Sequence, residues 1–319
     1  MGEFELIERF FKRAAPHAAV GIGDDCAIWT PSPGQQLAFS ADMLVEGRHF
    51  LSTVNPRDLG HKALAVNLSD LAACGATPRA FLLSLALPRV DEVWLSGFSQ
   101  GLFALADAHG CELIGGDTTQ GPLNVSITVM GEVPAHQAIL RSGAQEGDDL
   151  YVSGHLGDAR LALEAFRGTV SLSQSVFELA RSRMERPEPR TALGVALRGV
   201  ATAMADISDG LLGDLGHILK ASRVGADIHI SALQNLMLTR QTWPCPQHLL
   251  LRCILSGGDD YELVFTCHPS QHQQVLALRQ SCGTPVTRIG RITAEPRLLL
   301  LTEDGGVLPN TFSSFDHFA

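Results

Sequence analysis

The side chains in this sequence best suited to chemistry are aspartates that stand beside glycine. They occur as Gly-Ile-Gly-Asp-Asp at 21–25, Gly-Gly-Asp at 115–117, Asp-Ile-Ser-Asp-Gly at 206–210 and Gly-Gly-Asp-Asp at 257–260, and Asp42 adds a fifth position. An aspartate beside a glycine can be an ordinary turn. Carboxylates held close together, however, raise each other's pKa and repel unless a cation neutralises them. Mg²⁺ takes oxygen ligands and keeps positions for substrate phosphates, so the pattern predicts a metal-bridged phosphate site.

Asp70 lies near the C-terminal end of an otherwise apolar helix, which we expect to begin at Asn55-Pro56 and to run through Leu71. The helix macrodipole disfavours an anion at that end. Asp70 therefore either faces solvent or is held by a cation. Asn67, three residues earlier, shares its face of the helix.

The Asp-Ile-Ser-Asp-Gly motif follows an apolar strand and precedes a helix. Its side chains would project at the carboxyl end of a strand, where α/β proteins commonly bind ligands. A helix cap would explain Ser208 or Asp209 alone. It does not explain why Asp206, Ser208 and Asp209 occur together.

Composition excludes several classes of protein. The formal net charge is -10 and no block of lysine or arginine stands out, which argues against nucleic-acid binding. The start lacks the pattern of a signal peptide and no apolar stretch is long enough to span a bilayer, so we expect no membrane association and a cytoplasmic location. The 7 cysteines include no Cys-x-x-Cys and fit neither a disulfide framework nor a zinc site.

The lysines are Lys12, Lys62 and Lys220, and none of them lies in a P-loop. A kinase-type glycine loop paired with His-Arg-Asp is absent as well. If the chain binds ATP, divalent metal ions must carry most of the charge neutralisation, helped by arginine and backbone amides.

The pattern of hydrophobic residues predicts an α/β protein of two domains, 1–136 and 137–319, divided in a polar segment rich in turn-forming residues. In the first half we expect helices at 3–13, 56–71 and 91–109, and strands at 26–29, 37–40, 80–87, 112–114 and 123–133. In the second half we expect helices at 157–166, 173–184, 191–204, 211–222 and 270–281, and strands at 150–153, 205–207, 261–266, 284–292 and 298–301.

Read in order, the motifs resemble those of the thiamine-monophosphate kinase family. The matching segments are Gly-Ile-Gly-Asp-Asp-Cys-Ala at 21–27, Asn-Leu-Ser-Asp-Leu-Ala-Ala at 67–73, Leu-Ile-Gly-Gly-Asp-Thr-Thr at 113–119, Ile-Ser-Asp-Gly-Leu at 207–211 and Ser-Gly-Gly-Asp-Asp-Tyr-Glu-Leu at 256–263. The match continues to Phe-Asp-His-Phe at 315–318. A single motif such as Gly-Gly-Asp recurs in unrelated proteins, whereas the ordered set is highly specific.

The resemblance implies the two-domain fold of aminoimidazole ribonucleotide synthetase. In that fold an N-terminal domain binds ATP and Mg²⁺ and pairs its sheet across a homodimer, while a C-terminal domain, a mixed sheet flanked by helices, closes the site. The implied ligands of several Mg²⁺ ions are Asp25, Ser40, Ala41, Asp42, Asp70, Asp117, Asp206 and Asp209. The implied ATP contacts are Gly116, Asp117, Arg141 and Ser208. The implied contacts to thiamine monophosphate are His49, Asp259 and Phe315.

Some of these positions depart from the family pattern or have simpler explanations. Ala41 stands where threonine is usual, so only its carbonyl could meet a metal, and Asp259 stands where glutamate is usual. His49 could be a half-buried histidine with a backbone partner, and Arg141 a solvated loop residue. Phe315 could be a core anchor for the tail.

The implied reaction transfers the γ-phosphoryl group of ATP, the co-substrate, to the phosphate of thiamine monophosphate. Because that acceptor oxygen is already charged at neutral pH, no side chain is expected to act as an acid or base, and alignment with charge neutralisation would suffice. Two alternatives remain at this point. One is another ATP-dependent enzyme of the superfamily, of the selenophosphate or aminoimidazole ribonucleotide synthetase type; the other is a non-catalytic protein that binds Mg²⁺ or nucleotide.

Overall fold

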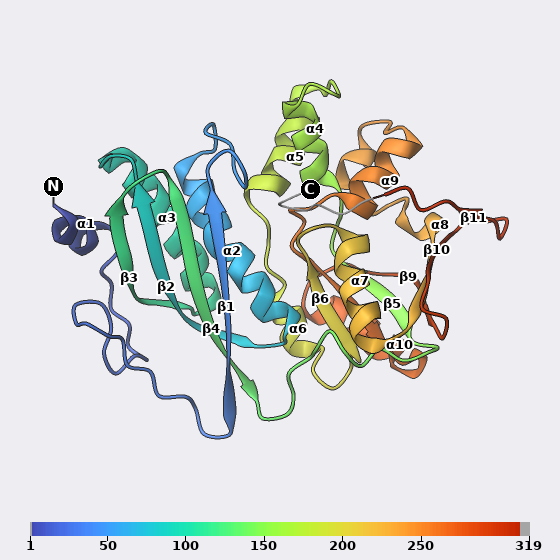
Figure 1. Cartoon of the computed structure of the whole chain (residues 1–319), viewed down its shortest axis with the longest axis horizontal. Coiled ribbons are helices and arrows are strands. Elements are labelled where there is room, and N and C mark those ends of the chain that lie inside the picture. Colours follow the sequence, from blue (N-terminus) through green and yellow to red (C-terminus); the bar gives the residue numbers. More distant parts are fainter. Residues whose placement is uncertain (1, 313–319) are drawn as a thin grey trace. The chain divides into compact units, whose positions relative to one another are not determined.

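The computed structural model describes residues 2–312 and divides the chain into two compact units (Figure 1). The first unit contains the residues up to Leu71 together with Ala76–His136. The second contains Ala72–Gly75 and the residues from Gln137 onward. Within the described residues, no helix is both long and apolar enough to cross a bilayer.

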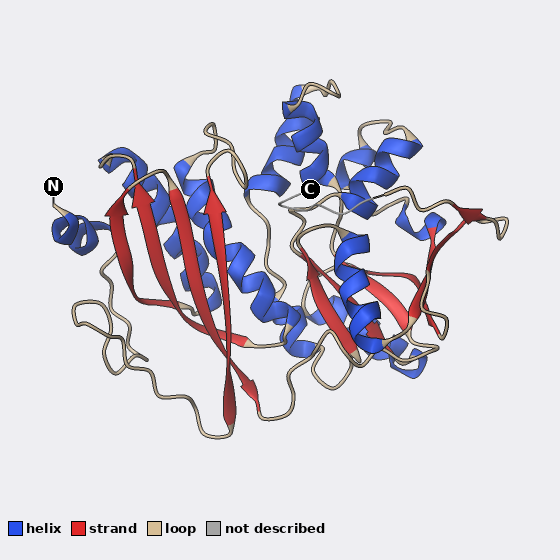
Figure 2. Ribbon diagram, in the orientation of Figure 1, coloured by secondary structure: helices blue, strands red, loops and turns tan. Residues whose placement is uncertain are grey.

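The first unit is a mixed four-stranded sheet with helices on one face (Figure 2). Its strands lie in the order β1-β4-β2-β3, in which β2 and β3 are parallel and the other pairs antiparallel. The bounds are β1 Gln35–Val45, β2 Thr77–Leu87, β3 Glu112–Gln120 and β4 Asn124–Pro134, with helices α1 Glu3–Phe10, α2 Pro56–Ala73 and α3 Glu92–His109.

Alternation along β2 defines the covered face of this sheet. Phe81, Leu83 and Leu85 are buried, whereas Leu82 and Ser84 are exposed, as the period of two requires when one face carries helices. Helices α2 and α3 approach closely. A Cβ at Gly101 would lie 1.8 Å from the carbonyl oxygen of Arg57, so only glycine fits there.

The segment between α1 and β1 packs on the other face of the sheet. Its contacts centre on a small core of Ala80, Ile114 and Met130, with Ala15, Ala18, Ala27 and Trp29 packed against it. The buried carboxylate of Glu132 fixes the segment further, because it accepts hydrogen bonds from the backbone N–H and the hydroxyl of Ser32, both at 2.9 Å, and pairs with Arg79 at 3.0 Å. The segment that carries the acidic turn at 21–25 is thus fixed to the sheet at Ser32, a few residues after the turn.

The second unit is built on a mixed seven-stranded sheet in the order β11-β10-β7-β9-β5-β8-β6. The strands are β5 Asp149–Ser153, β6 Ala203–Ile207, β7 Gly225–His229, β8 Glu262–Cys267, β9 Val286–Thr293, β10 Leu298–Leu301 and β11 Val307–Leu308. The helices are α4 Asp158–Phe166, α5 Gln174–Glu185, α6 Thr191–Ala196, α7 Leu211–Ser222, α8 Ile230–Leu233, α9 Gln247–Ser256 and α10 His272–Ser281, with 3-10 turns η1 Leu238–Gln241 and η2 Pro269–Gln271.

Every residue of β5, β6 and β8 is buried, so these strands are mostly apolar and do not show the alternation of a sheet with one face in solvent. Leu150 and Val152 join one core with residues of α4, α5, α7 and α9, whereas Tyr151 joins a second core with residues of α6 and α10. Strand β6 likewise contributes to both cores, and its Met204 belongs to the second. These strands form the fixed support from which the acidic turns of this unit project.

The structure differs from the expected elements in a few places. The strand expected at 26–29 is only an isolated bridge between Val20 and Ile28. The helix expected at 191–204 ends at Ala196, and Gly199, with a φ of 71°, turns the chain toward β6. The elements β7, α8, α9 and β11 were not expected, because short segments of weak periodicity give little signal.

Candidate active site

Strand β1 and helix α2 bring three of the expected metal positions together in the first unit. The hydroxyl of Ser40 donates a hydrogen bond to the carboxylate of Asp70, and the backbone N–H of Asp42 donates to Asn67 Oδ1 at 3.1 Å. Asn67 is buried and its Nδ2 donates to the carbonyl of Ala63 at 3.0 Å, which holds its amide in place. Asp70 and Asp42 are each half-buried, so both carboxylates lie where β1 meets α2.

Ala41 stands between Ser40 and Asp42 but belongs to the opposite face of β1. Ser40 and Asp42 pair with Val129 and Ile127, which are buried beneath the helices, whereas Ala41 is exposed. Successive side chains of a strand point to opposite faces. The methyl group of Ala41 therefore points away from Asp70, and only its main chain could join a ligand set with its neighbours.

Gly116 and Asp117 lie on β3, at the far edge of the same sheet. Gly116 has a φ of 143°, and a Cβ there would lie 1.8 Å from the carbonyl oxygen of Leu83, so the position requires glycine. A cross-strand row joins Asp42 to Gly116 through Ile127 and Leu83. Three strand spacings separate the ends of that row by roughly 14 Å. A single ion could not bind the side chains at both edges, whereas several ions along a polyphosphate could.

Asp25 lies on the exposed turn of the anchored segment between α1 and β1. Its backbone N–H donates to Asp24 Oδ1 at 2.8 Å, and Gly23 adopts a φ of 124°. Both carboxylates are exposed. The turn is therefore shaped by its own first aspartate and leaves the side chain of the second at the surface.

His49 follows β1 in a tight turn and is half-buried. Its backbone N–H donates to the carbonyl of Val45, and the N–H of Val45 donates to His49 Nδ1, each at 3.0 Å. Because Nδ1 accepts a hydrogen bond, the ring proton resides on Nε2 and the imidazole is neutral. The buried ammonium group of Lys62 donates to the carbonyl of His49 at 3.2 Å. The ring is thus oriented by the backbone, whatever it binds.

In the second unit, the motifs at 206–210 and 257–260 form one hydrogen-bonded block, although they lie far apart in the sequence. The backbone N–H of Asp259 donates to the carbonyl of Ser208 at 2.9 Å, and that of Tyr261 donates to the carbonyl of Ile207 at 2.8 Å. The hydroxyl of Tyr261 donates to Asp259 Oδ1 at 3.2 Å. Asp259 and Tyr261 have φ values of 68° and 50°. Left-handed backbone at residues other than glycine stores strain and clusters at functional sites.

The carboxylates of this block differ in exposure, which distinguishes those that a ligand can reach from those that are buried. Asp209 and Asp259 are half-buried, whereas Asp206 is only 5% exposed. Asp260 is turned inward, where the N–H of Gly157 donates to its two carboxylate oxygens at 2.9 and 3.1 Å. Burial raises the pKa of Asp260 well above its usual value, although the Gly157 hydrogen bond opposes this shift. Of the Asp259–Asp260 pair, only Asp259 can therefore meet a ligand directly.

Asp214 is a buried carboxylate in this block that the sequence reasoning missed. Its Oδ2 accepts hydrogen bonds from the backbone N–H groups of Ser208, Asp209 and Gly210, at 3.0, 3.1 and 3.1 Å. Burial raises the pKa of Asp214 to about 7, the nearby Asp209 carboxylate adds to this rise, and the N–H donors oppose it. The available signal was an aspartate in the first turn of the helix that follows the motif.

The two remaining positions carry less structural information. Arg141 is exposed, and its carbonyl accepts a hydrogen bond from Ser222 Oγ at 3.3 Å. That hydroxyl also accepts the N–H groups of Gly143 and Ala144, so the loop is held while the guanidinium remains at the surface. Phe315 lies outside the described residues.

No group of three or more His, Cys, Asp or Glu side chains in residues 2–312 is arranged to hold a metal ion by itself. The donor chemistry nevertheless fits Mg²⁺. The candidates are carboxylate oxygens, several of them exposed, and Mg²⁺ is usually bound through one or two carboxylates with water and substrate phosphates completing its octahedron.

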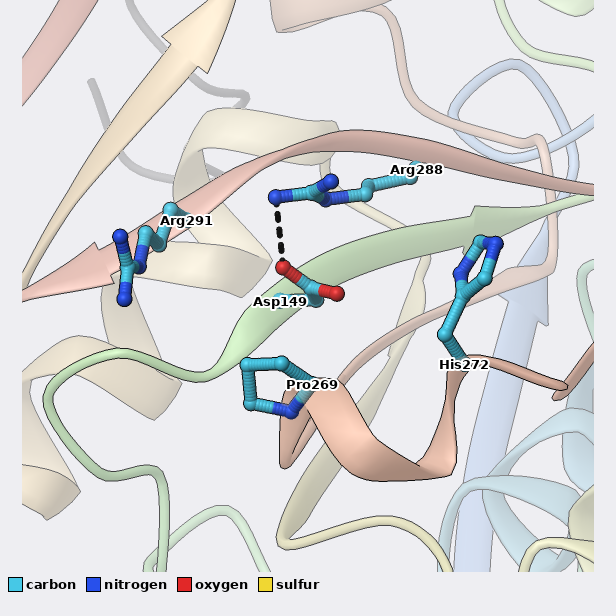
Figure 3. A pocket seen from close by; sticks show the side chains of 5 residues that line it. All are labelled: Asp149, Pro269, His272, Arg288 and Arg291. Atoms are coloured by element: carbon cyan, nitrogen blue, oxygen red, sulfur yellow. Dashed lines mark ion pairs between the residues drawn. The ribbon is translucent and has the colours of Figure 1, made fainter. Parts of the chain in front are cut away.

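A cavity of about 360 Å³ lies elsewhere in the second unit, lined by Asp149, Pro269, His272, Arg288 and Arg291 (Figure 3). Arg288 pairs with Asp149 at 2.7 Å. The cavity lies where β5 begins, at the end of the sheet opposite the acidic turns. None of the residues expected to bind metal, ATP or thiamine monophosphate lines it.

The two halves of the chain match two models of related domains. Residues 23–133 match the AIR synthase related protein, N-terminal domain, and residues 145–301 match the AIR synthase related protein, C-terminal domain. Together with the two mixed α/β sheets, these matches define the class as the two-domain AIR synthase-like proteins.

Individual relatives narrow the class. The chain is 44% identical over 322 residues to the thiamine-monophosphate kinase of Salmonella typhimurium, covering 100% of this chain and 98% of that protein, and 34% identical over 335 residues to that of Bacillus subtilis, covering 100% of both. A crystal structure of thiamine-monophosphate kinase from Stenotrophomonas maltophilia K279a superimposes with a TM-score of 0.85 at 42% identity over 96% of each chain. AaThiL complexed with AMPPCP and TMP gives 0.76 at 28%, covering 91% of this chain and 89% of that one. The chain belongs to the thiamine-monophosphate kinase family.

Proposed function

We propose that this chain is an ATP-dependent thiamine-phosphate kinase, which converts thiamine monophosphate and ATP into thiamine diphosphate and ADP. One observation carries the proposal: the full-length relationship to thiamine-monophosphate kinases, at up to 44% identity among the relatives compared. A more distant relative, AaThiL, is known in complex with AMPPCP, an analogue of ATP, and TMP. The ordered acidic motifs of the sequence suit the same pair of phosphate ligands.

The proposed cofactor is Mg²⁺, bound as several ions. In the first unit Asp25, Asp42, Asp70 and Asp117 would supply carboxylates, and Ser40 would hold Asp70 through its hydroxyl. In the second unit Asp206 and Asp209 would do so. Magnesium, when bound, would neutralise charge on the donor and acceptor phosphates. The separation of Asp42 from Asp117 across the sheet supports more than one ion.

The chain's own contribution would be binding and alignment rather than proton transfer. Ser208 and Arg141 would contact ATP, with Gly116 allowing the backbone of β3 to approach it. His49, Asp259 and Phe315 would contact thiamine monophosphate. Because Nδ1 of His49 already accepts the N–H of Val45, the ring suits donation of a hydrogen bond to the substrate from Nε2 and not general-base catalysis. Direct in-line transfer predicts inversion at the γ-phosphorus, and retention measured with a chiral phosphate would contradict it.

We also propose that the chain works as a homodimer that pairs through the part of the first sheet, on the face opposite its helices, that the segment between α1 and β1 leaves exposed. The exposed fractions of Phe39, Met43, Leu82 and Leu37 on that face are 63%, 54%, 39% and 36%. Leu37, Phe39 and Met43 follow one another along this face of β1, and Leu82 of β2 lies on the same face, with Thr128 of β4 between it and Ala41. Contiguous exposed apolar patches mark interaction sites. We also propose a cytoplasmic location, because both substrates carry charged phosphate groups.

The test is an assay that mixes the purified chain with Mg²⁺, ATP and thiamine monophosphate and detects thiamine diphosphate as its fluorescent thiochrome. We expect product that depends on every component and disappears with EDTA. Thiamine in place of thiamine monophosphate is the control acceptor. A folded sample that forms no thiamine diphosphate would overturn the proposal and leave the binding-protein alternative.

A further inference from the structure

The loop that precedes α7 is held on both sides of its backbone. On one side, the N–H groups of Ser208, Asp209 and Gly210 converge on a single oxygen of Asp214, which is 4% exposed. On the other side, the carbonyl of Ser208 accepts the N–H of Asp259. The peptide groups of Ser208 therefore cannot rotate without breaking a hydrogen bond.

This arrangement differs from an ordinary helix cap. A capping side chain precedes the helix and accepts N–H groups of its first turn. Asp214 lies inside the first turn of α7 and reaches back to residues before it, while Gly210 at the N-cap makes no side-chain cap. The carboxylate thus fixes the loop rather than the helix.

Three successive N–H groups that converge in this way form a nest of the kind that binds phosphate and other anions. Here a buried carboxylate of the protein already fills the nest. The backbone of 208–210 is consequently not available to cradle the polyphosphate. The N–H groups of this loop are therefore closed to a ligand, and the hydroxyl of Ser208 and the carboxylate of Asp209 are its side-chain groups that a ligand could meet.

We propose that Asp214 is a positioning residue for the phosphoryl transfer. It sets the directions in which Ser208 and Asp209 project toward Mg²⁺ and nucleotide, without touching either. This inference rests on the proposed function. It extends the proposed function by assigning the loop's rigidity to one buried carboxylate and by excluding the N–H groups of 208–210 as phosphate ligands.

The test compares Asp214→Ala and Asp214→Asn with a matched control, Asp148→Ala. Asp148 is 1% exposed and likewise accepts a backbone N–H, from Gln145 at 2.9 Å, and a hydroxyl, from Thr202 at 2.7 Å. It lies at the opposite end of the same sheet from Asp214. Both alanine variants remove a buried carboxylate that holds backbone, so both lower the melting temperature.

Only the Asp214 variants should change how the enzyme uses its ligands. For Asp214→Ala we expect kcat to fall and the half-saturating Mg²⁺ concentration to rise, each by roughly 10- to 100-fold, as is typical when a group that orients metal ligands is lost. Asp214→Asn retains an oxygen acceptor and should lose less. Added formate, which can enter the space left by alanine, should restore part of the activity of Asp214→Ala and leave the wild type unchanged.

A purely structural role gives a different result. If Asp214→Ala, below its melting temperature, keeps kcat and the Mg²⁺ dependence within twofold of the wild type, as Asp148→Ala should, the proposal is wrong. If Asp214→Ala does not fold, Asp214→Asn decides by the same criterion. Calorimetry with Mg²⁺ and AMPPCP in the absence of thiamine monophosphate makes the comparison independent of turnover. A wild type that forms no thiamine diphosphate would overturn the proposed function, while the binding data would still judge Asp214.

Discussion

The acidic residues of the two units are held in different ways. In the first unit the carboxylates of Asp25 and Asp117 are exposed, and Asp70 is held by the hydroxyl of Ser40. In the second unit the acidic turns are joined by backbone hydrogen bonds, and Asp214 closes the block from within. The second group is ordered by the fold itself. The acidic residues of the first unit are held mainly by side-chain contacts, and a bound cation could bring their carboxylates together.

Because of this difference, we expect substitutions in the two units to affect the free energy of unfolding and the turnover rate differently. Removing a charge from the exposed aspartates of the first unit costs few native contacts and relieves repulsion between like charges. Changing the block of the second unit breaks buried backbone contacts, which are costly to leave unmade. Substitutions of the site aspartates in the first unit should therefore reduce turnover with little change in stability, whereas substitutions within the hydrogen-bonded block of the second unit should reduce both.

The largest effect is expected from Asp70→Asn, which keeps the shape of the side chain and removes its charge. We expect Mg²⁺-dependent turnover to fall roughly 10²- to 10³-fold, the usual loss when one group stabilising charge in the transition state is removed. The melting temperature should change little. Asp58→Asn, in the first turn of the same helix, is the control and should retain wild-type turnover. Unchanged turnover in Asp70→Asn would remove Asp70 from the metal site.

Gly258→Ala tests the block of the second unit. An added Cβ would lie 2.5 Å from the carbonyl oxygen of Ser208, so the turns must separate. We expect a loss of about 2–4 kcal/mol in the free energy of unfolding, in the range of overpacking and broken buried hydrogen bonds. Gly216→Ala in α7 meets nothing within 4 Å and should stabilise the protein by about 0.5–1 kcal/mol. Denaturant titration measures both, and equal effects would contradict the tight packing of the block.

Glu132→Gln probes the anchor of the segment that carries Asp25. Burial alone would raise the pKa of Glu132, but the hydrogen bonds from Ser32 and the Arg79 guanidinium outweigh it and lower the pKa. A lowered pKa in the folded state contributes stability above the unfolded pKa, about 4.3, that is lost as the pH falls through the folded value. We expect the variant to lose about 1–2 kcal/mol at neutral pH and the gap to close in acid.

The control for Glu132→Gln is Glu112→Gln. Glu112 contacts Nδ1 of His17 in the same segment at 2.5 Å, and that histidine side chain is 75% exposed. The Glu112 side chain is 14% exposed, and because its partner is open to solvent, which weakens an ion pair, we expect Glu112→Gln to cost less stability than Glu132→Gln. A wild-type advantage over Glu132→Gln that stays constant down to acid pH would show that the carboxylate charge is not what anchors the segment.

The smallest effect on stability is expected from Asp25→Asn. The side chain is exposed, so the free energy of unfolding should change by at most about 0.5 kcal/mol. The half-saturating Mg²⁺ concentration should nevertheless rise, which a Mg²⁺ titration of turnover measures. A stability loss comparable with that of Gly258→Ala would mean that the two units are not built as differently as their contacts indicate.

Much of the fold could be predicted from the sequence because strong patterns determine it. The helix expected at 91–109 is α3, Glu92–His109, with Asp91 as its N-cap and Gly110 as its C-cap, and the order of acidic motifs identifies the family. The helix expected at 191–204 was too long because its apolar residues continue into β6. A continuous apolar run does not by itself distinguish a buried helix from a buried strand.

The sequence predicts which residues form the candidate site, and it does not predict the contacts that hold them in place. An aspartate in the first turn of a helix, such as Asp214, is common because it complements the macrodipole. Nothing in the sequence indicates that it turns back to three preceding N–H groups. The inward turn of Asp260 is equally invisible, since its partner Gly157 lies far away along the chain. Such contacts arise only from tertiary geometry.

The hydrogen bonds between the 206–210 and 257–261 turns also set a rule for engineering. The N–H groups of Asp259 and Tyr261 bond to the carbonyls of Ser208 and Ile207, so neither turn has a backbone conformation independent of the other. To introduce the acceptor specificity of a relative, both turns would have to be replaced together by the corresponding turns of that relative. Replacing one turn alone would pair it with a turn from a different sequence, and the backbone hydrogen bonds between the two would be at risk.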